Sequence, residues 1–143
     1  MIIESDDWGS IRMPSNEAYN NLIKAGIDLD NDEGRRFNKY DTLATSADLS
    51  LLFEVLGSVK DSTNRTAVMT PVSVVANPDF KKISESDFKE YHYESFTETL
   101  LKYPGSENSF NIWKEGIQKR LFVPQFHGRE HLNVQSWLKA LQA

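Results

Sequence analysis

The sequence predicts an α/β fold built from parallel βα units. Short apolar, β-branched runs are typical of buried strands, and amphipathic segments between them are typical of helices. The resulting order of strand, helices, strand, helices, strand and helix indicates parallel strands, which need a crossover connection that is usually helical. Three or four such strands make about half of a (β/α) barrel, which takes roughly 250 residues. We therefore expect a partial (β/α) barrel, and a chain that is incomplete as a catalytic domain.

The first third of the chain predicts one strand, one helix and one loop. Residues 1–5 are typical of a short buried strand. Ser15 or Asn16 is expected to cap a helix over residues 18–23. The charged segment 28–40 is expected to be a polar loop.

The middle of the chain predicts two helices and a strand. Ser46 is expected to cap a helix in which apolar residues recur at helical spacing, namely Leu49, Leu52, Phe53 and Leu56. Residues 67–76 are rich in valine and predict a buried strand that is interrupted or kinked near Pro71. A short extended piece over 90–94 and a helix over 96–102 are expected to follow.

The last third predicts a helix, a strand and a helix. Asn108 or Ser109 is expected to cap a helix whose apolar stripe runs from Phe110 to Leu121. Residues 122–126 predict a strand, and residues 134–141 predict the last helix. Two tryptophans lie on helical apolar stripes and are expected in the core: Trp113 and Trp137.

Composition excludes several kinds of partner and site. The net charge is −5 without a cluster of lysine and arginine, which gives no electrostatic footprint for nucleic acid or an anionic membrane. The sequence has no apolar run long enough to span a membrane and no signal-peptide pattern, so the default expectation is cytoplasmic. Because cysteine is absent, a metal ion must be held by histidine and carboxylate side chains.

Two polar clusters predict a divided metal site. Asp6 and Asp7 follow the first strand, and His127 and His131 follow the last. Each cluster alone is more often a solvated turn or a chance spacing, but two adjacent carboxylates after an apolar strand cannot both be buried without a counter-charge. The spacing of four predicts that both imidazoles share one face of a helical turn. Two imidazoles and one carboxylate form a recurring catalytic zinc site.

These motifs resemble those of the polysaccharide deacetylases of the NodB-homology type. The first family motif is Thr-Phe-Asp-Asp-Gly, of which Asp6 and Asp7 remain; the second is His-Ser/Thr-x-x-His, of which His127 and His131 remain, with Gly128 in place of the hydroxyl residue. The resemblance implies a distorted, incomplete (β/α) barrel, of which residues 1–143 are the N-terminal portion.

The resemblance also implies an activity and a role for each motif residue. Asp6 is the expected catalytic base, and Asp7, His127 and His131 are the expected ligands of a divalent metal, Zn²⁺ in the first place. The implied reaction is hydrolysis of an N- or O-acetyl group on a carbohydrate substrate. Three residues flank these motifs and are expected to line a sugar subsite: Trp8, Arg12 and Arg129. The third histidine, His92, is expected to have a surface or packing role.

Two alternatives remain open on the sequence. The segment from His127 to His131 also fits the His-x-x-Glu-His pattern of a zinc metalloprotease, in which Glu130 is the general base and the motif lies within a helix. A non-catalytic remnant or binding module of the same fold is the second alternative.

A half-barrel also leaves a sheet edge and helix faces uncovered, which predicts self-association of this chain.

Overall fold

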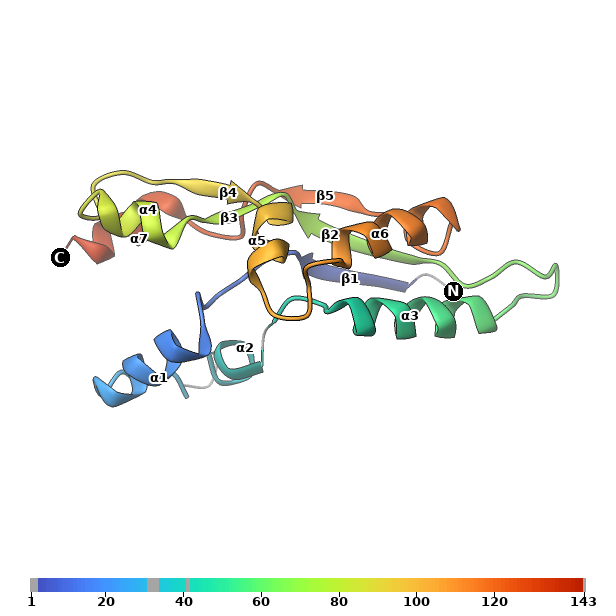
Figure 1. The fold of residues 1–143 in the computed structure, drawn as a ribbon, viewed down its shortest axis with the longest axis horizontal. Helices are drawn as coiled ribbons and strands as arrows, with labels where there is room; N and C mark the ends of the chain where they lie inside the picture. The colour runs from blue at the N-terminus through green and yellow to red at the C-terminus, as the bar shows by residue number, and fades with distance from the viewer. Residues whose placement is uncertain (1–2, 31–33, 41, 143) are drawn as a thin grey trace. The chain divides into compact units, whose positions relative to one another are not determined.

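The computed structural model describes residues 3–30, 34–40 and 42–142, and its contacts divide the chain into two compact units. One unit is Ile11–Thr42, and the other combines Met1–Ser10 with Leu43–Ala143. The fold is mixed α/β, with a three-stranded parallel sheet, a two-stranded sheet and seven helices in the part of the chain that is described (Figure 1). The α/β class is therefore confirmed. The grouping of residues 1–143 into one catalytic domain stays a prediction.

The parallel sheet in the larger unit has the strand order β1-β2-β5. Its strands are β1 (Ile3–Trp8), β2 (Met69–Val74) and β5 (Gln125–Gly128). The central strand β2 is almost fully buried, as its apolar sequence predicts for a parallel strand covered on both faces. Because all three strands run the same way, the ends of β1 and β5 lie at one edge of the sheet.

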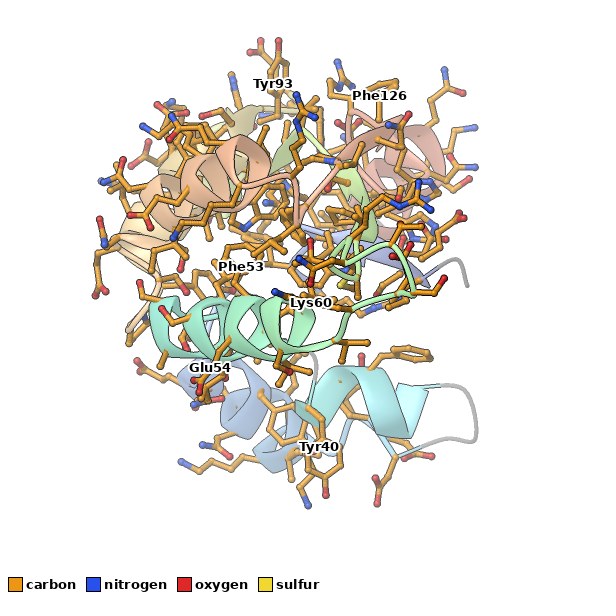
Figure 2. The ribbon with its side chains drawn as sticks, turned by 90° about the vertical axis from the view of Figure 1, so that its right-hand side faces the viewer. Tyr40, Phe53, Glu54, Lys60, Tyr93 and Phe126 are labelled. Carbon is orange, nitrogen blue, oxygen red and sulfur yellow. The ribbon has the colours of Figure 1, made fainter. Side chains whose placement is uncertain are left out.

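Two helices, α3 (Ser46–Ser58) and α6 (Ser109–Gln118), enclose the main core with this sheet. Phe53 reaches from α3 into the core (Figure 2), where its ring centroid lies 5.2 Å from that of Phe122. The ring centroid of Trp113 from α6 lies 5.0 Å from that of Phe122, and Trp113 is buried, which confirms its predicted place in the core. The cap of α3 is Thr45, one residue before the predicted Ser46, because Thr45 forms a capping box with Asp48.

A two-stranded antiparallel sheet departs from the predicted parallel units. It pairs β3 (Ala76–Pro78) with β4 (Tyr93–Ser95), and α4 (Phe80–Glu85) lies between them in the chain. The strand predicted over 67–76 breaks at Val75 instead of Pro71, because there the chain leaves β5 and takes β4 as its partner. The six residues of α4 bury only Ile83, so no apolar period predicted this helix.

The remaining helices of the larger unit match the predicted ranges. α5 (Phe96–Lys102) begins at Ser95, which forms a capping box with Glu98. α7 (Val134–Leu141) begins at Asn133, whose side chain accepts a hydrogen bond from the backbone of Ser136. Trp137 on α7 is half-buried and packs edge-on against Phe80 and Tyr91, outside the main core cluster.

The smaller unit contains α1 (Asn16–Lys24) and α2 (Gly34–Tyr40). Ser15 caps α1 by accepting a hydrogen bond from the backbone of Ala18, as the sequence predicted. The predicted loop over 28–40 is wrong at its end, where α2 forms. The sequence of α2 has charged residues in place of an apolar helical stripe. Residues 31–33 of the predicted loop lie outside the described part of the chain.

Candidate metal site

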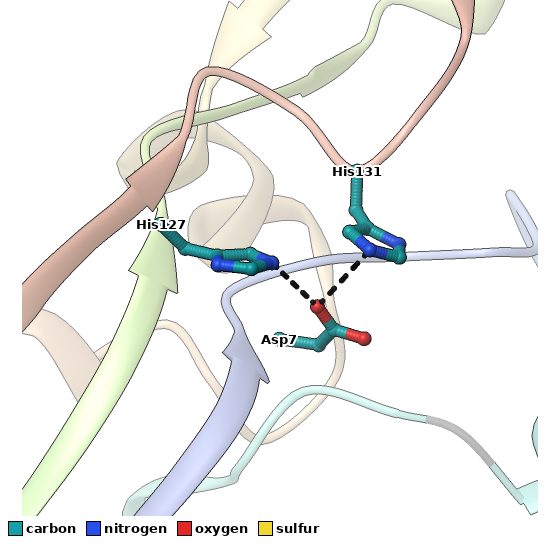
Figure 3. A group of neighbouring side chains, drawn as sticks. All are labelled: Asp7, His127 and His131. Carbon is teal, nitrogen blue, oxygen red and sulfur yellow. Dashed lines mark ion pairs between the residues drawn. The ribbon is translucent and has the colours of Figure 1, made fainter.

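The side chains of Asp7, His127 and His131 converge at the edge of the parallel sheet where β1 and β5 end (Figure 3). β2 lies between these two strands, so their backbones are about 9.5 Å apart. Asp7 and His127 bridge this gap with their side chains, and Asp7 Oδ1 lies 3.3 Å from His127 Nε2. The cluster therefore joins residues from opposite ends of the sequence.

A bulge at the end of β1 places both aspartates beside the same imidazole. Adjacent residues of a regular strand point to opposite faces of the sheet. Here the pairing of β1 with β2 shifts between Ser5 and Trp8, and Asp7 takes a φ of 59°, a left-handed value that aspartate tolerates better than most residues. As a result, Asp6 Oδ1 lies 3.5 Å from His127 Nδ1, while Asp7 faces Nε2.

Asn77, a residue that the sequence analysis did not select, holds the turn after Asp7. Its side chain is 1% exposed, and its amide donates a hydrogen bond of 2.8 Å to the Gly9 carbonyl and one of 3.2 Å to Thr99 Oγ1. Gly9 has a φ of 83°, and a Cβ there would lie 3.2 Å from the Phe96 ring. The turn that follows the metal-ligand candidate Asp7 is thus tied to β3 and α5.

The two histidines are brought together by a strand and a loop, not by a helical turn as predicted. His127 lies on β5 and His131 lies in the loop before α7. The backbone amides of Val75 and Ala76 donate hydrogen bonds to the Arg129 carbonyl and hold the start of this loop against the segment that joins β2 to β3. The two rings stack with their centroids 5.4 Å apart and an interplanar angle of 21°.

The distances among the three side chains are short enough for them to share one metal ion. In a tetrahedral site with ligand distances of 2.0–2.2 Å, the ligand atoms lie about 3.4 Å from one another. Asp7 Oδ1 lies 3.3 Å from His127 Nε2 and 3.7 Å from His131 Nε2, and all three atoms lie within 4.8 Å of one another. All three side chains are partly exposed, while the oxygen of Asp7 that faces both imidazoles, Oδ1, is buried between them. The group can hold a metal ion.

Between the two histidines, Arg129 and Glu130 form a closed polar pair. The Arg129 guanidinium donates two hydrogen bonds to the Glu130 carboxylate, which is 7% exposed, and this contact raises the pKa of Arg129. The guanidinium also lies 4.7 Å from the Tyr93 ring and 5.8 Å from the Tyr91 ring. The loop thereby gains a rigid anchor beside His131.

Tyr91, in contact with Arg129, is a second residue that the sequence analysis did not select. Burial raises its pKa to about 12, and the negative charge of Glu130 acts in the same direction. Its hydroxyl is buried and has no hydrogen-bond partner among the described residues. The phenol therefore stays neutral near pH 7 and contributes packing in place of a polar contact.

The structure places the three predicted sugar-binding residues in different surroundings. Trp8 packs edge-on against Trp113 and Phe122, with centroids 5.9 and 5.3 Å away, and so fills part of the core. Arg129 donates two hydrogen bonds to Glu130. Arg12 belongs to the smaller unit, where its guanidinium lies 4.6 Å from the Phe37 ring. A contact of any of the three with a sugar stays a prediction.

Comparison with protein-family models, with curated proteins and with solved structures found no match for this chain. Among its described residues, no helix has both the length and the apolar character needed to cross a membrane. The geometry of the Asp-His-His group is therefore the observation from which a function has to be argued.

Proposed function

We propose that this protein is a metal-dependent hydrolase that removes acetyl groups from a carbohydrate, with Asp7, His127 and His131 as ligands of a zinc ion. The supporting observation is that one possible ligand atom from each of these three residues lies within 4.8 Å of the other two. Asp7 is 120 positions from His127 in the sequence, so the fold brings them together. The motif resemblance to polysaccharide deacetylases supports the substrate class. On this proposal the parallel sheet is part of a distorted, incomplete (β/α) barrel.

The chemistry of the donor set agrees with a hydrolytic role. When bound, a zinc ion supplies Lewis acidity that polarises an acyl carbonyl and lowers the pKa of a coordinated water to about 7. Two neutral imidazoles and one carboxylate leave a net positive charge at such a site and an open position for a fourth ligand. Both features favour hydrolysis over purely structural binding.

Asp6 is the residue proposed to move the proton. Its carboxylate accepts a proton from the attacking water while the water oxygen bonds to the acetyl carbon. The carbon–nitrogen or carbon–oxygen bond then breaks, and Asp6 returns the proton to the leaving nitrogen or oxygen. The products are acetate and a free amine or hydroxyl on the sugar, so the step needs no further reactant.

The metalloprotease alternative receives no support from the local structure. It requires a helix through residues 127–131, whereas His127 is on a strand and His131 is in a loop. It also requires Glu130 as a base, but this carboxylate is almost fully buried and takes both of its hydrogen bonds from Arg129.

Zinc titration by calorimetry on the metal-free protein tests the proposed ligands. We expect one-to-one binding by the wild type and at least a tenfold loss in Asp7→Asn and His131→Ala. Asp87→Asn is a matched control, because Asp87 is also an aspartate with a left-handed φ, at 56°. His92→Ala controls for the loss of a histidine.

Acetate release from acetylated oligosaccharides tests the reaction. We expect release by the zinc-loaded wild type and its loss in Asp6→Asn. Zinc binding that survives Asp7→Asn would overturn the proposed site. Tight zinc binding without acetate release would favour the binding-module alternative.

A further inference from the structure

The imidazole of His127 lies between two carboxylates, each facing a different ring nitrogen. Nε2 lies 3.3 Å from Asp7 Oδ1, and Nδ1 lies 3.5 Å from Asp6 Oδ1. A neutral imidazole has one nitrogen with a lone pair and one with a hydrogen, so it binds a metal through one and donates a hydrogen bond through the other. The two flanking carboxylates therefore have different tasks.

The position of His131 indicates which nitrogen of His127 faces the metal. His131 Nε2 lies 3.7 Å from the same oxygen of Asp7 that faces His127 Nε2. The ligand group thus forms around Nε2 of His127, and Nδ1 points to Asp6 on the other side of the ring.

We propose that Asp6 is a positioning residue for His127, in addition to its proposed role in proton transfer. Its Oδ1 accepts the Nδ1 hydrogen of His127 and so holds the tautomer that presents Nε2 to the metal. This inference rests on the proposed function, because it assumes that Asp7, His127 and His131 bind a metal ion.

The strand bulge explains how Asp6 reaches this position. The backbone amide of Asp7 donates a hydrogen bond of 2.9 Å to Asp6 Oδ1, which fixes this oxygen at the start of the bulge. The proposed hydrogen bond requires the contact of 3.5 Å with His127 to shorten to about 2.9 Å.

Positioning and proton transfer differ in their effect on the resting protein. A residue that only accepts a proton during the reaction leaves metal affinity unchanged when it is replaced. A carboxylate that orients a histidine ligand typically changes metal affinity 10- to 100-fold when it is lost. Metal binding without substrate therefore separates the two tasks.

Zinc calorimetry on three variants measures this effect. We expect Asp6→Ala to weaken binding about 10- to 100-fold and Asp6→Asn to weaken it only a few-fold, because the amide oxygen still accepts the Nδ1 hydrogen. Glu4→Ala is the control for loss of one negative charge, since Glu4 is an exposed carboxylate earlier on β1. Circular dichroism establishes that each variant is folded.

Nitrogen-15 NMR of the zinc-loaded proteins supplies the second readout. We expect the Nδ1-protonated tautomer of His127 in the wild type and in Asp6→Asn, and a loss of this single state in Asp6→Ala. Unchanged affinity in Asp6→Ala overturns the inference. Weaker binding with an unchanged His127 tautomer also overturns it, because Asp6 then acts through the Asp7 amide alone. Failure of the wild type to bind zinc overturns the proposed function itself.

Discussion

The substitution Gly116→Ala on α6 tests how α6 packs against α3. A Cβ built at this glycine would lie 2.3, 2.6 and 2.9 Å from three atoms of the Phe53 ring. Ordinary contact begins near 3.4 Å, so Gly116→Ala requires the ring to move by about 1.1 Å, the difference between 3.4 and 2.3 Å. Phe53 is buried and packs edge-on against Phe122, so this movement disturbs the core.

The expected change in the free energy of unfolding combines one stabilising and two destabilising effects of Gly116→Ala. Alanine favours a helix interior over glycine by about 1 kcal/mol. Overpacking of a core costs about 1–3 kcal/mol, and a disturbed aromatic pair costs about 0.5–1.5 kcal/mol. We therefore expect a net loss of about 2 kcal/mol in the free energy of unfolding, which lowers Tm by on the order of 5–10 °C.

Gly57→Ala is the matched control, because it is the same substitution in helix α3. A Cβ at Gly57 would meet no atom within 4 Å. Only the helix propensity remains, so we expect a gain of about 0.5–1 kcal/mol. Thermal unfolding followed by circular dichroism measures both variants. Equal stabilisation by the two substitutions would refute the packing of Phe53 against Gly116.

Three further predictions concern single side chains. Tyr91→Phe is expected to leave stability unchanged or raise it by up to about 1 kcal/mol in urea unfolding, because the buried hydroxyl has no partner among the described residues. The pKa of Tyr91 is raised from 10.0 to about 12 in the folded protein, so the folded state favours the neutral phenol. The stability that this preference gives is present below pH 10 and is lost as pH rises toward 12, and Tyr91→Phe removes this alkaline decline. The Asp61 pKa is lowered from 3.8 to about 2, mainly by the backbone amide of Arg65, so its contribution is present above pH 3.8 and is lost as pH falls toward 2; Asp61→Asn is expected to flatten the decline of Tm over this range. Phe126 on β5 is 72% exposed (Figure 2), so we expect concentration-dependent self-association in analytical ultracentrifugation that Phe126→Glu reduces.

Each of these predictions has an outcome that contradicts it. A loss of more than 1 kcal/mol in Tyr91→Phe would mean that the hydroxyl has a partner. An unchanged acid decline in Asp61→Asn would mean that the Asp61 hydrogen bonds do not persist in solution. A monodisperse monomer over a wide concentration range would remove the prediction of self-association.

Elements with a strong local pattern were predicted from the sequence. The ranges of α5 and α7 agree with the predicted ones, and Ser15 caps α1 as expected. These segments have caps and apolar periods that act within one or two helical turns. α2 and α4 were missed because neither presents an apolar helical stripe; Ile83 is the buried residue of α4.

Contacts between distant segments were beyond the reach of these patterns. β2 ends at Val74 because the chain there exchanges one partner strand for another, and nothing in the local sequence marks that exchange. Asn77 was not selected from the sequence, because its importance comes from a hydrogen bond to Gly9 across 68 positions of the sequence.

The sequence by itself determined the chemistry that is available at the candidate site. With no cysteine, it limits metal ligands to imidazole and carboxylate, and it predicts Asp6, Asp7, His127 and His131 near the ends of two strands. Only the tertiary structure decided their geometry. The bulge that turns both aspartates toward one imidazole depends on the register between β1 and β2, and the loop that returns His131 to Asp7 depends on its backbone bonds to the segment that joins β2 to β3. Such pairings join residues far apart in the chain, so their energies exist only once the strands have assembled.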